Sequence, residues 1–333
     1  MLNVLKTGMG FVGFTTIRMS YIKRLLNIIH KKMKKIIIVT LLALVSASSQ
    51  AQLLYKISGN GLKEPSYIVG TYHLAKISFV DSIPGIRKVM DECQQTYCEV
   101  RMQDMFIPDS LAIIQNAQLM PEGTTLDKIL SADEMTRLNA YMKDLLGADM
   151  TNPMVAEQLG KFTPGAISVQ LLLVHYMKKD KGFDVNNQFD TYFQKEAIAQ
   201  GKDIGGLETI AFQAKVLYQG KTLERQKEGL MCQVDNAEFI DKMTEAVIQA
   251  FYAQNLDAMK AAADMKMHNG CDATPEEEAQ LIYDRNADWL TKMPAIMKQK
   301  ATLFAVGALH LVGEKGVLNL LRQAGYTVEG VTE

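Results

Sequence analysis

Two histidines stand in almost identical local frames near opposite ends of the chain. The segments YIVGTYHL (67–74) and FAVGALHL (304–311) each contain an apolar, β-prone run followed by Gly-x-x-His-Leu, with the histidine at His73 or His310. The chain has only five histidines, so this repetition is informative. A glycine three residues upstream lets the backbone turn or approach a neighbour closely. A histidine projected from a rigid strand end is suited to metal binding or proton transfer.

A carboxylate accompanies the two histidines. Glu99 lies in a second predicted strand, 96–100, where a buried carboxylate must be paired, protonated or metal-bound. A simple ion pair with Arg101 is the plainer alternative. Together, His73, Glu99 and His310 form a standard ligand set for a hydrolytic divalent metal with an open position. The same three groups also suit metal-free hydrolysis in which one histidine activates water, and the sequence does not separate the two.

Three further polar residues are candidates for catalysis. Glu208 precedes a predicted helix, where a helix cap or first-turn acid is the plain interpretation. Arg285 and Asn286 are adjacent on a helix of mixed charge, where an ordinary solvated pair is the plain interpretation. The alternative is that Glu208 or Glu99 acts as a ligand or general base, while the Arg-Asn pair anchors a substrate carboxylate or stabilises an oxyanion.

The elements around the histidines repeat as well. Each motif is followed by a loop, a helical pattern and a second strand, at 81–100 and at 314–330. Between them, residues 108–287 are helix-rich, with one short strand at 202–208. We therefore expect an α+β fold whose central β-sheet is built from two βαβ-like units and interrupted by a long helical insertion. Catalytic groups in such sheets gather at the carboxyl ends of strands. The methionine-rich insertion is either core filler or an adaptable binding surface.

The N-terminal residues have the pattern of an export signal. Met33-Lys-Lys, an apolar run at 36–45 and Ser49-Gln-Ala51 predict a signal peptide at 33–51, cleaved near Ala51. Residues 1–32 are interpreted as an extension that results from a start codon assigned too far upstream, with Met33 as the true initiator. The expected product is a single domain, 52–333, that is periplasmic or secreted and keeps no stable membrane anchor.

The net charge limits the classes of binding partner, and the cysteine content indicates which disulfides can form. Residues 1–51 hold eight Lys or Arg and no Asp or Glu, so the rest has 28 basic against 37 acidic residues, a formal charge of −9. This balance argues against a nucleic-acid partner and leaves a peptide or small-molecule substrate. In an oxidising compartment the four cysteines favour disulfides, with a Cys232–Cys271 bridge plausible and Cys93 and Cys98 either paired or buried.

These motifs resemble those of the TraB/GumN family, which includes the Tiki proteins. The resemblance rests on the two Gly-x-x-His motifs, the early strand glutamate, Leu207-Glu208-Thr209, the Arg-Asn pair and the closing GALHLVGxxGVL with Gly325-Tyr326-x-Val328. It covers about 53–331. It implies a divalent-metal-dependent protease, with an ion of the Mn, Co or Zn class among His73, Glu99 and His310, and with Glu208 and Arg285-Asn286 lining the cleft. Related superfamily members also imply two alternatives, a metal-independent esterase and a haem-binding protein.

Overall fold

A computed structural model describes residues 52–181, 184 and 188–332. The predicted extension and signal peptide, 1–51, lie outside these residues. Within the described ranges, no helix combines the length and the apolar character needed to cross a membrane.

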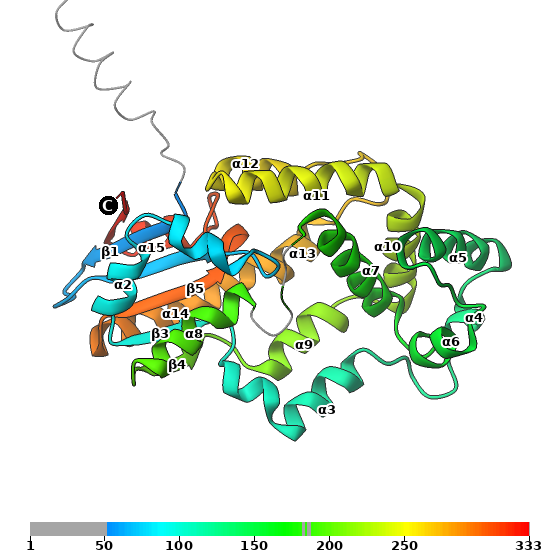
Figure 1. Cartoon of the computed structure of the whole chain (residues 1–333), viewed down its shortest axis with the longest axis horizontal. Coiled ribbons are helices and arrows are strands. Elements are labelled where there is room, and N and C mark those ends of the chain that lie inside the picture. Colours follow the sequence, from blue (N-terminus) through cyan, green and yellow to red (C-terminus); the bar gives the residue numbers. More distant parts are fainter. Residues whose placement is uncertain (1–51, 182–183, 185–187, 333) are drawn as a thin grey trace, which may run out of the picture. The chain divides into compact units, whose positions relative to one another are not determined.

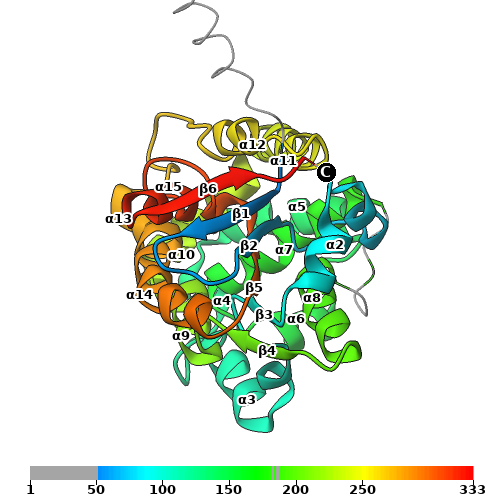
Figure 2. The same cartoon turned by 90° about the vertical axis from the view of Figure 1, so that its left-hand side faces the viewer.

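One mixed six-stranded sheet positions the rest of the fold. Its strands are arranged in the order β4-β3-β5-β2-β1-β6 (Figure 2). The four strands from β4 to β2 are parallel, whereas β1 is antiparallel to both β2 and β6. The bounds are β1 Leu54–Gly59, β2 Ser66–Thr71, β3 Gln95–Cys98, β4 Asp203–Gly206, β5 Thr302–Gly307 and β6 Tyr326–Gly330.

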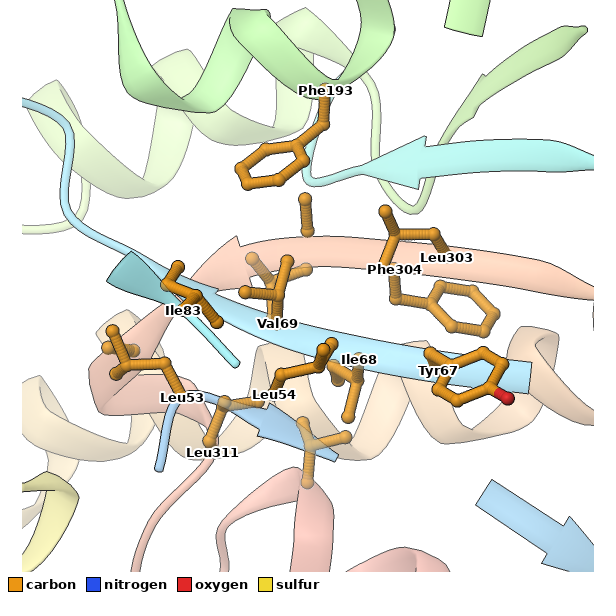
Figure 3. Close-up of a cluster of buried hydrophobic side chains, with 14 of the residues drawn as sticks. Leu53, Leu54, Tyr67, Ile68, Val69, Ile83, Phe193, Leu303, Phe304 and Leu311 are labelled. Atoms are coloured by element: carbon orange, nitrogen blue, oxygen red, sulfur yellow. The ribbon is translucent and has the colours of Figure 1, made fainter. Parts of the chain in front are cut away.

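The central strands are apolar because both of their faces are covered. Every residue of β2 and nearly every residue of β5 is buried, which is typical of parallel strands between helical layers. Ile68, Val69 and Phe304 pack with side chains from the neighbouring strands and helices (Figure 3). The edge strand β1 alternates more, and Asn60 adopts a positive φ of 46° in the turn that leads to β2. This core fixes where the carboxyl ends of β2 and β5 emerge.

Helices cover both faces of the sheet and extend beyond its carboxyl edge. α2 and α8 cover one face and α14 and α15 the other, while α3 to α7 and α9 to α11 lie largely beyond the sheet edge (Figures 1 and 2). The longer helices are α2 Ile86–Glu92, α3 Pro108–Ala117, α5 Ala132–Leu146, α6 Pro153–Leu159, α7 Pro164–Lys179, α8 Phe189–Ala199, α9 Ile210–Tyr218, α10 Leu223–Asp235, α11 Ala237–Tyr252, α12 Leu256–Ala263, α14 Asp284–Gln299 and α15 Val317–Gln323. Single turns form α4 Leu126–Ile129 and α13 Pro275–Glu278.

The helical part has a core of its own. Buried residues of α4, α5, α7 and α10, among them Leu138, Ile167 and Leu230, form a second apolar cluster apart from the sheet. A disulfide between Cys232 and Cys271 ties α10 to the loop after α12, whereas Cys93 and Cys98 are buried and free. The bridge fits an oxidising compartment.

The predicted α+β class is confirmed, with differences in detail. The two βαβ-like units interleave, because β5 lies between β2 and β3 in the sheet. The helix predicted at 81–95 is shorter, since Ile77–Ser82 forms a 3-10 helix and α2 begins only at Ile86. β3 ends at Cys98, so Glu99 follows the strand.

Candidate functional site

The four parallel strands each deliver a polar residue just beyond their carboxyl ends. His73 follows β2, Glu99 follows β3, Glu208 follows β4, and His310 ends the short 3-10 helix Ala308–His310 after β5. Because parallel strands end at one edge of the sheet, residues far apart in the sequence meet there. The backbone also joins β3 and β4, since the Glu208 N–H donates to the Glu99 carbonyl at 2.8 Å.

The glycine of each histidine motif is needed for close packing. A Cβ added at Gly70 would lie 3.0 Å from side-chain atoms of Ala308 and Leu311, which belong to the other motif. A Cβ at Gly307 would lie 3.1 Å from Glu99 Oε1, the atom that accepts the Gly307 N–H at 2.9 Å. Both motifs therefore use glycine for approach rather than for a positive φ.

Arg285 is the centre of a buried charge cluster. Its Nε and Nη2 donate to the Glu208 carboxylate at 3.0 and 2.6 Å, and Nη2 also donates to Glu99 Oε2 at 2.6 Å. Its Nη1 contacts His310 Nε2 at 3.1 Å and donates to the Leu281 carbonyl at 3.1 Å. The Arg285 side chain is only 5 % exposed. The plain alternative of a solvated Arg-Asn pair is wrong, because α14 turns both side chains towards the sheet edge, where they are buried.

The hydrogen bonds of Asn286 determine which ring nitrogen of His310 carries the proton. Its Nδ2 donates to the His310 carbonyl at 3.2 Å and to the Lys315 carbonyl at 2.9 Å, so its Oδ1 is the acceptor for His310 Nδ1 at 2.7 Å. The ring therefore carries its proton on Nδ1, and the lone pair on Nε2 accepts from Arg285. In this arrangement His310 is a neutral structural acceptor.

Two residues that were not predicted complete the cluster. Trp289 donates from Nε1 to Glu208 Oε2 at 3.2 Å, and its ring packs against the His310 ring in a tilted arrangement, with the centroids 4.4 Å apart and 40° between the planes. Gln213 donates from Nε2 to Glu208 at 3.0 Å and to Glu99 at 3.2 Å. Trp289 is the sole tryptophan of the chain and follows Arg285 by four residues, a spacing that places both on one helix face. That spacing in the sequence could have identified Trp289 as a neighbour of Arg285 in the site.

His73 belongs to a separate, accessible pair. Its Nδ1 is hydrogen-bonded to Asp190, at the start of α8, and Asp190 also accepts from the Thr71 hydroxyl. The Asp190 carbonyl accepts from Cys98 Sγ at 3.6 Å, which places the start of α8 against β3. The His73 side chain is 69 % exposed, so Nε2, on the opposite side of the ring, is open to solvent. Asp190, an acid in the first turn of α8, was not among the predicted site residues.

Charge and burial tune the site. Asp190 is the main cause that raises the pKa of His73 to about 9, and water screens part of this effect because the ring is exposed. Burial lowers the pKa of His310 to about 4. For Glu99, burial opposes ionisation, but His310, Arg285 and His73 together lower the pKa to about 2. Burial lowers the pKa of Arg285, but Glu208 and Glu99 outweigh it and leave the pKa raised. Since Glu99 and Arg285 both act on His73, the pair and the cluster form one electrostatic unit.

Acid is expected to destabilise this cluster. His310 has a folded pKa near 4, below the value of about 6.5 in an unfolded chain, so its contribution is complete above about pH 6.5 and is lost as the pH falls towards 4. Glu99 adds a second loss between about pH 4.5 and 2. Urea unfolding at a series of pH values measures this. A His310→Gln variant should lose the first of the two dependences. An unchanged pH slope in that variant would contradict the assignment.

The predicted site residues are thus placed in two groups. Glu99, Glu208, Arg285, Asn286 and His310 form one hydrogen-bonded cluster. His73 lies beside it with Asp190. The N-cap interpretation of Glu208 is wrong, since Thr209 caps α9 and the Glu208 carboxylate is buried against the guanidinium.

The predicted metal ligands do not fit a divalent ion as they are packed here. Both oxygens of Glu99 and both ring nitrogens of His310 have protein partners, and His310 Nε2 lies 3.9 Å from Glu99 Oε1 with Arg285 beside both. The buried guanidinium already supplies the positive charge that would otherwise attract a cation. In the part of the chain that the structure describes, no group of three or more His, Cys, Asp or Glu side chains is placed to hold a metal.

Comparisons with known proteins identify relatives of this chain. Residues 53–330 match the TraB/PrgY/gumN family. "Metalloprotease TIKI2" from Xenopus tropicalis is 26% identical over 310 residues, covering 80% of this chain and 57% of that protein. "Metalloprotease TIKI2" from Danio rerio is 24% identical and covers 80% of this chain and 58% of that protein. "Metalloprotease TIKI1" from Homo sapiens is 24% identical and covers 80% of this chain and 59% of that protein. The chain thus spans somewhat over half the length of these relatives. No solved structure matches it.

The family match covers both histidine motifs, the strand-end glutamates and α14, which together build the site described above. The chain belongs to the TraB/PrgY/gumN family.

Proposed function

We propose that this chain is an exported hydrolase that cleaves peptide bonds, with water activated at His73. The observation that carries the proposal is the exposed His73–Asp190 pair beside the buried Arg285 cluster, at the carboxyl edge of the parallel strands. The relatives named metalloproteases support a peptide bond as the target. The signal-peptide pattern and the Cys232–Cys271 bridge support export.

The geometry assigns a role to each group. Asp190 accepts from His73 Nδ1 and so orients Nε2 to take a proton from water, the role that a carboxylate has beside a catalytic histidine. The Arg285 guanidinium is too buried to touch a substrate and is a positioning residue that keeps Glu99 ionised. An ionised Glu99 stabilises the imidazolium that forms when His73 accepts the proton, and the imidazolium then donates that proton to the leaving amine nitrogen as the C–N bond breaks.

The names of the relatives also suggest a metal ion. For a three-ligand site, Glu99 and His310 would have to exchange their contacts with Arg285 for the metal. The residues do not fit such an ion as packed, so no step of the proposed reaction passes through one.

A peptide-cleavage screen tests the proposal. Purified 52–333 protein is incubated with a defined peptide mixture, and products are identified by mass spectrometry, beside a His73→Gln variant as the matched control. We expect discrete cleavage products from the wild type that are missing from the variant. Equal products from both proteins would contradict the proposal. A parallel incubation with a chelator, followed by manganese or cobalt, tests the predicted metal dependence, because lost and restored cleavage would favour the three-ligand arrangement.

A further inference from the structure

A cavity in the helical part lies beside the buried Arg285 cluster, on the side where Leu281 and Leu309 line it. Its volume is about 540 Å3, within the range of sites that hold small molecules or peptide segments. α7, α9, α10, α11 and the loop after α12 form its walls. Two lining residues touch the site directly along the chain, since Leu309 precedes His310 and the Leu281 carbonyl accepts from Arg285.

The wall shared with the cluster has an unusual backbone. Residues Ala279–Tyr283 form a single π-helical turn between α13 and α14, and Leu281 lies at its centre. Such turns are rare and are frequent at functional sites. Here the turn exposes Leu281, which is 44 % accessible, while placing its carbonyl on Arg285. The cavity and the cluster are therefore linked by one short segment.

The chemistry of the lining favours an uncharged apolar occupant. Val169, Leu217 and Leu281 line the cavity with large apolar side chains that remain accessible. Three methionines also line it, and their flexible side chains adapt to different shapes. They are Met243, Met265 and Met267.

The charged residues of the lining are already satisfied by one another. Arg225 donates to Glu277 at 2.8 Å, and Lys260 lies 2.6 Å from Asp264. The remaining lining cations, Lys221 and Lys266, also pair with acidic neighbours, Glu277 and Glu278. Because each lining cation has a carboxylate partner, the cavity offers no unpaired cation to an anionic ligand, and the remaining acid, Asp272, accepts from the Met267 N–H at 2.7 Å.

We propose that this cavity is a specificity subsite that holds hydrophobic side chains of a peptide substrate on the Leu281 and Leu309 side of the charge cluster. The inference rests on the proposed peptide hydrolysis for its biological role, but the binding itself does not. The disulfide braces the subsite, since Cys271 belongs to the lining and fixes the Met265–Cys271 loop to α10.

The test begins with a neutral fluorescent probe, N-phenyl-1-naphthylamine, titrated into the full 52–333 protein. We expect saturable enhancement in the wild type and a loss of affinity of about tenfold or more in Gly229→Phe. Gly229 lines the cavity and an added Cβ there meets no atom within 4 Å, so the larger side chain can fill the space without disturbing the helix. Leu111→Phe, at an exposed position on α3 outside the lining, is the matched control and should bind like the wild type.

Competition then identifies the occupant. A leucine-rich peptide should displace the probe, and a serine-substituted peptide of equal length should not. No saturable enhancement in the wild type, equal affinity in Gly229→Phe, or displacement by a fatty acid but not by the peptide would each overturn the proposal. Probe and peptide binding in a protein that cleaves no peptide would support the subsite and count against the proposed hydrolysis alone, so the two failures are distinguishable.

Discussion

His73→Ala is expected to lower kcat/KM for peptide cleavage by about 10²- to 10⁴-fold, the range that a positioned acid or base contributes. The ring is largely exposed and its hydrogen bond is to Asp190, so its removal should change the melting temperature little. The rate and the melting temperature, measured on the same preparation, separate a chemical role from a structural one.

His268→Asn is the matched control for that variant. His268 is exposed, lies in a loop and has a positive φ of 58°, which asparagine tolerates. This variant removes an imidazole from the surface without touching the site and should keep wild-type kcat/KM. A His73→Ala enzyme with undiminished kcat/KM would remove His73 from the mechanism.

Arg285→Ala is expected to destabilise the protein by about 3–5 kcal/mol, because it leaves two buried carboxylates without their cation. Glu208 and Glu99 both contact the guanidinium at 2.6 Å, and His310 loses its Nε2 partner at the same time. Urea unfolding, monitored by the fluorescence of Trp289, measures the loss. Trp289 reports on the cluster directly, since its Nε1 donates to Glu208.

Two further variants test whether unpaired buried charge causes the loss of stability in Arg285→Ala. Arg137→Ala breaks exposed ion pairs to Asp133 and Asp235, which water screens, and should therefore lower the stability much less than Arg285→Ala does. Adding Glu208→Gln to Arg285→Ala should recover part of the stability, because the double variant buries one charge fewer. A double variant less stable than Arg285→Ala alone would contradict the view that unpaired charge causes the loss.

The sequence predicted the parts of the site that repeat locally. The two Gly-x-x-His frames identified both histidines and the approximate strands, because apolar runs and glycines are read within a few residues. Glu99 was found as the carboxylate of a predicted buried strand, and Glu208 as an acid that precedes a predicted helix. Their meeting could be expected only in general terms, since parallel strands end at one edge.

The missing parts depend on long-range contacts. Asp190 is an ordinary first-turn acid until α8 packs against the end of β3. The tautomer of His310 follows from the side-chain amide of Asn286 on α14. Arg285 is buried between its carboxylate partners only because α14 turns this face towards the sheet edge. Residue types alone made His73, Glu99 and His310 equivalent metal ligands. The packing separates an accessible His73 from a buried, hydrogen-bonded His310.

The most direct test of the account is the pH dependence of kcat/KM in the wild type and in Asp190→Asn. Only neutral His73 can accept a proton, and Asp190 raises its pKa, so the wild-type rate should increase with pH through a limb between about 6.5 and 9. Without the carboxylate, the pKa falls towards about 6.5, so the limb should shift to lower pH as the maximal rate drops. A limb at the same pH in both enzymes would contradict the claim that the His73–Asp190 pair activates water.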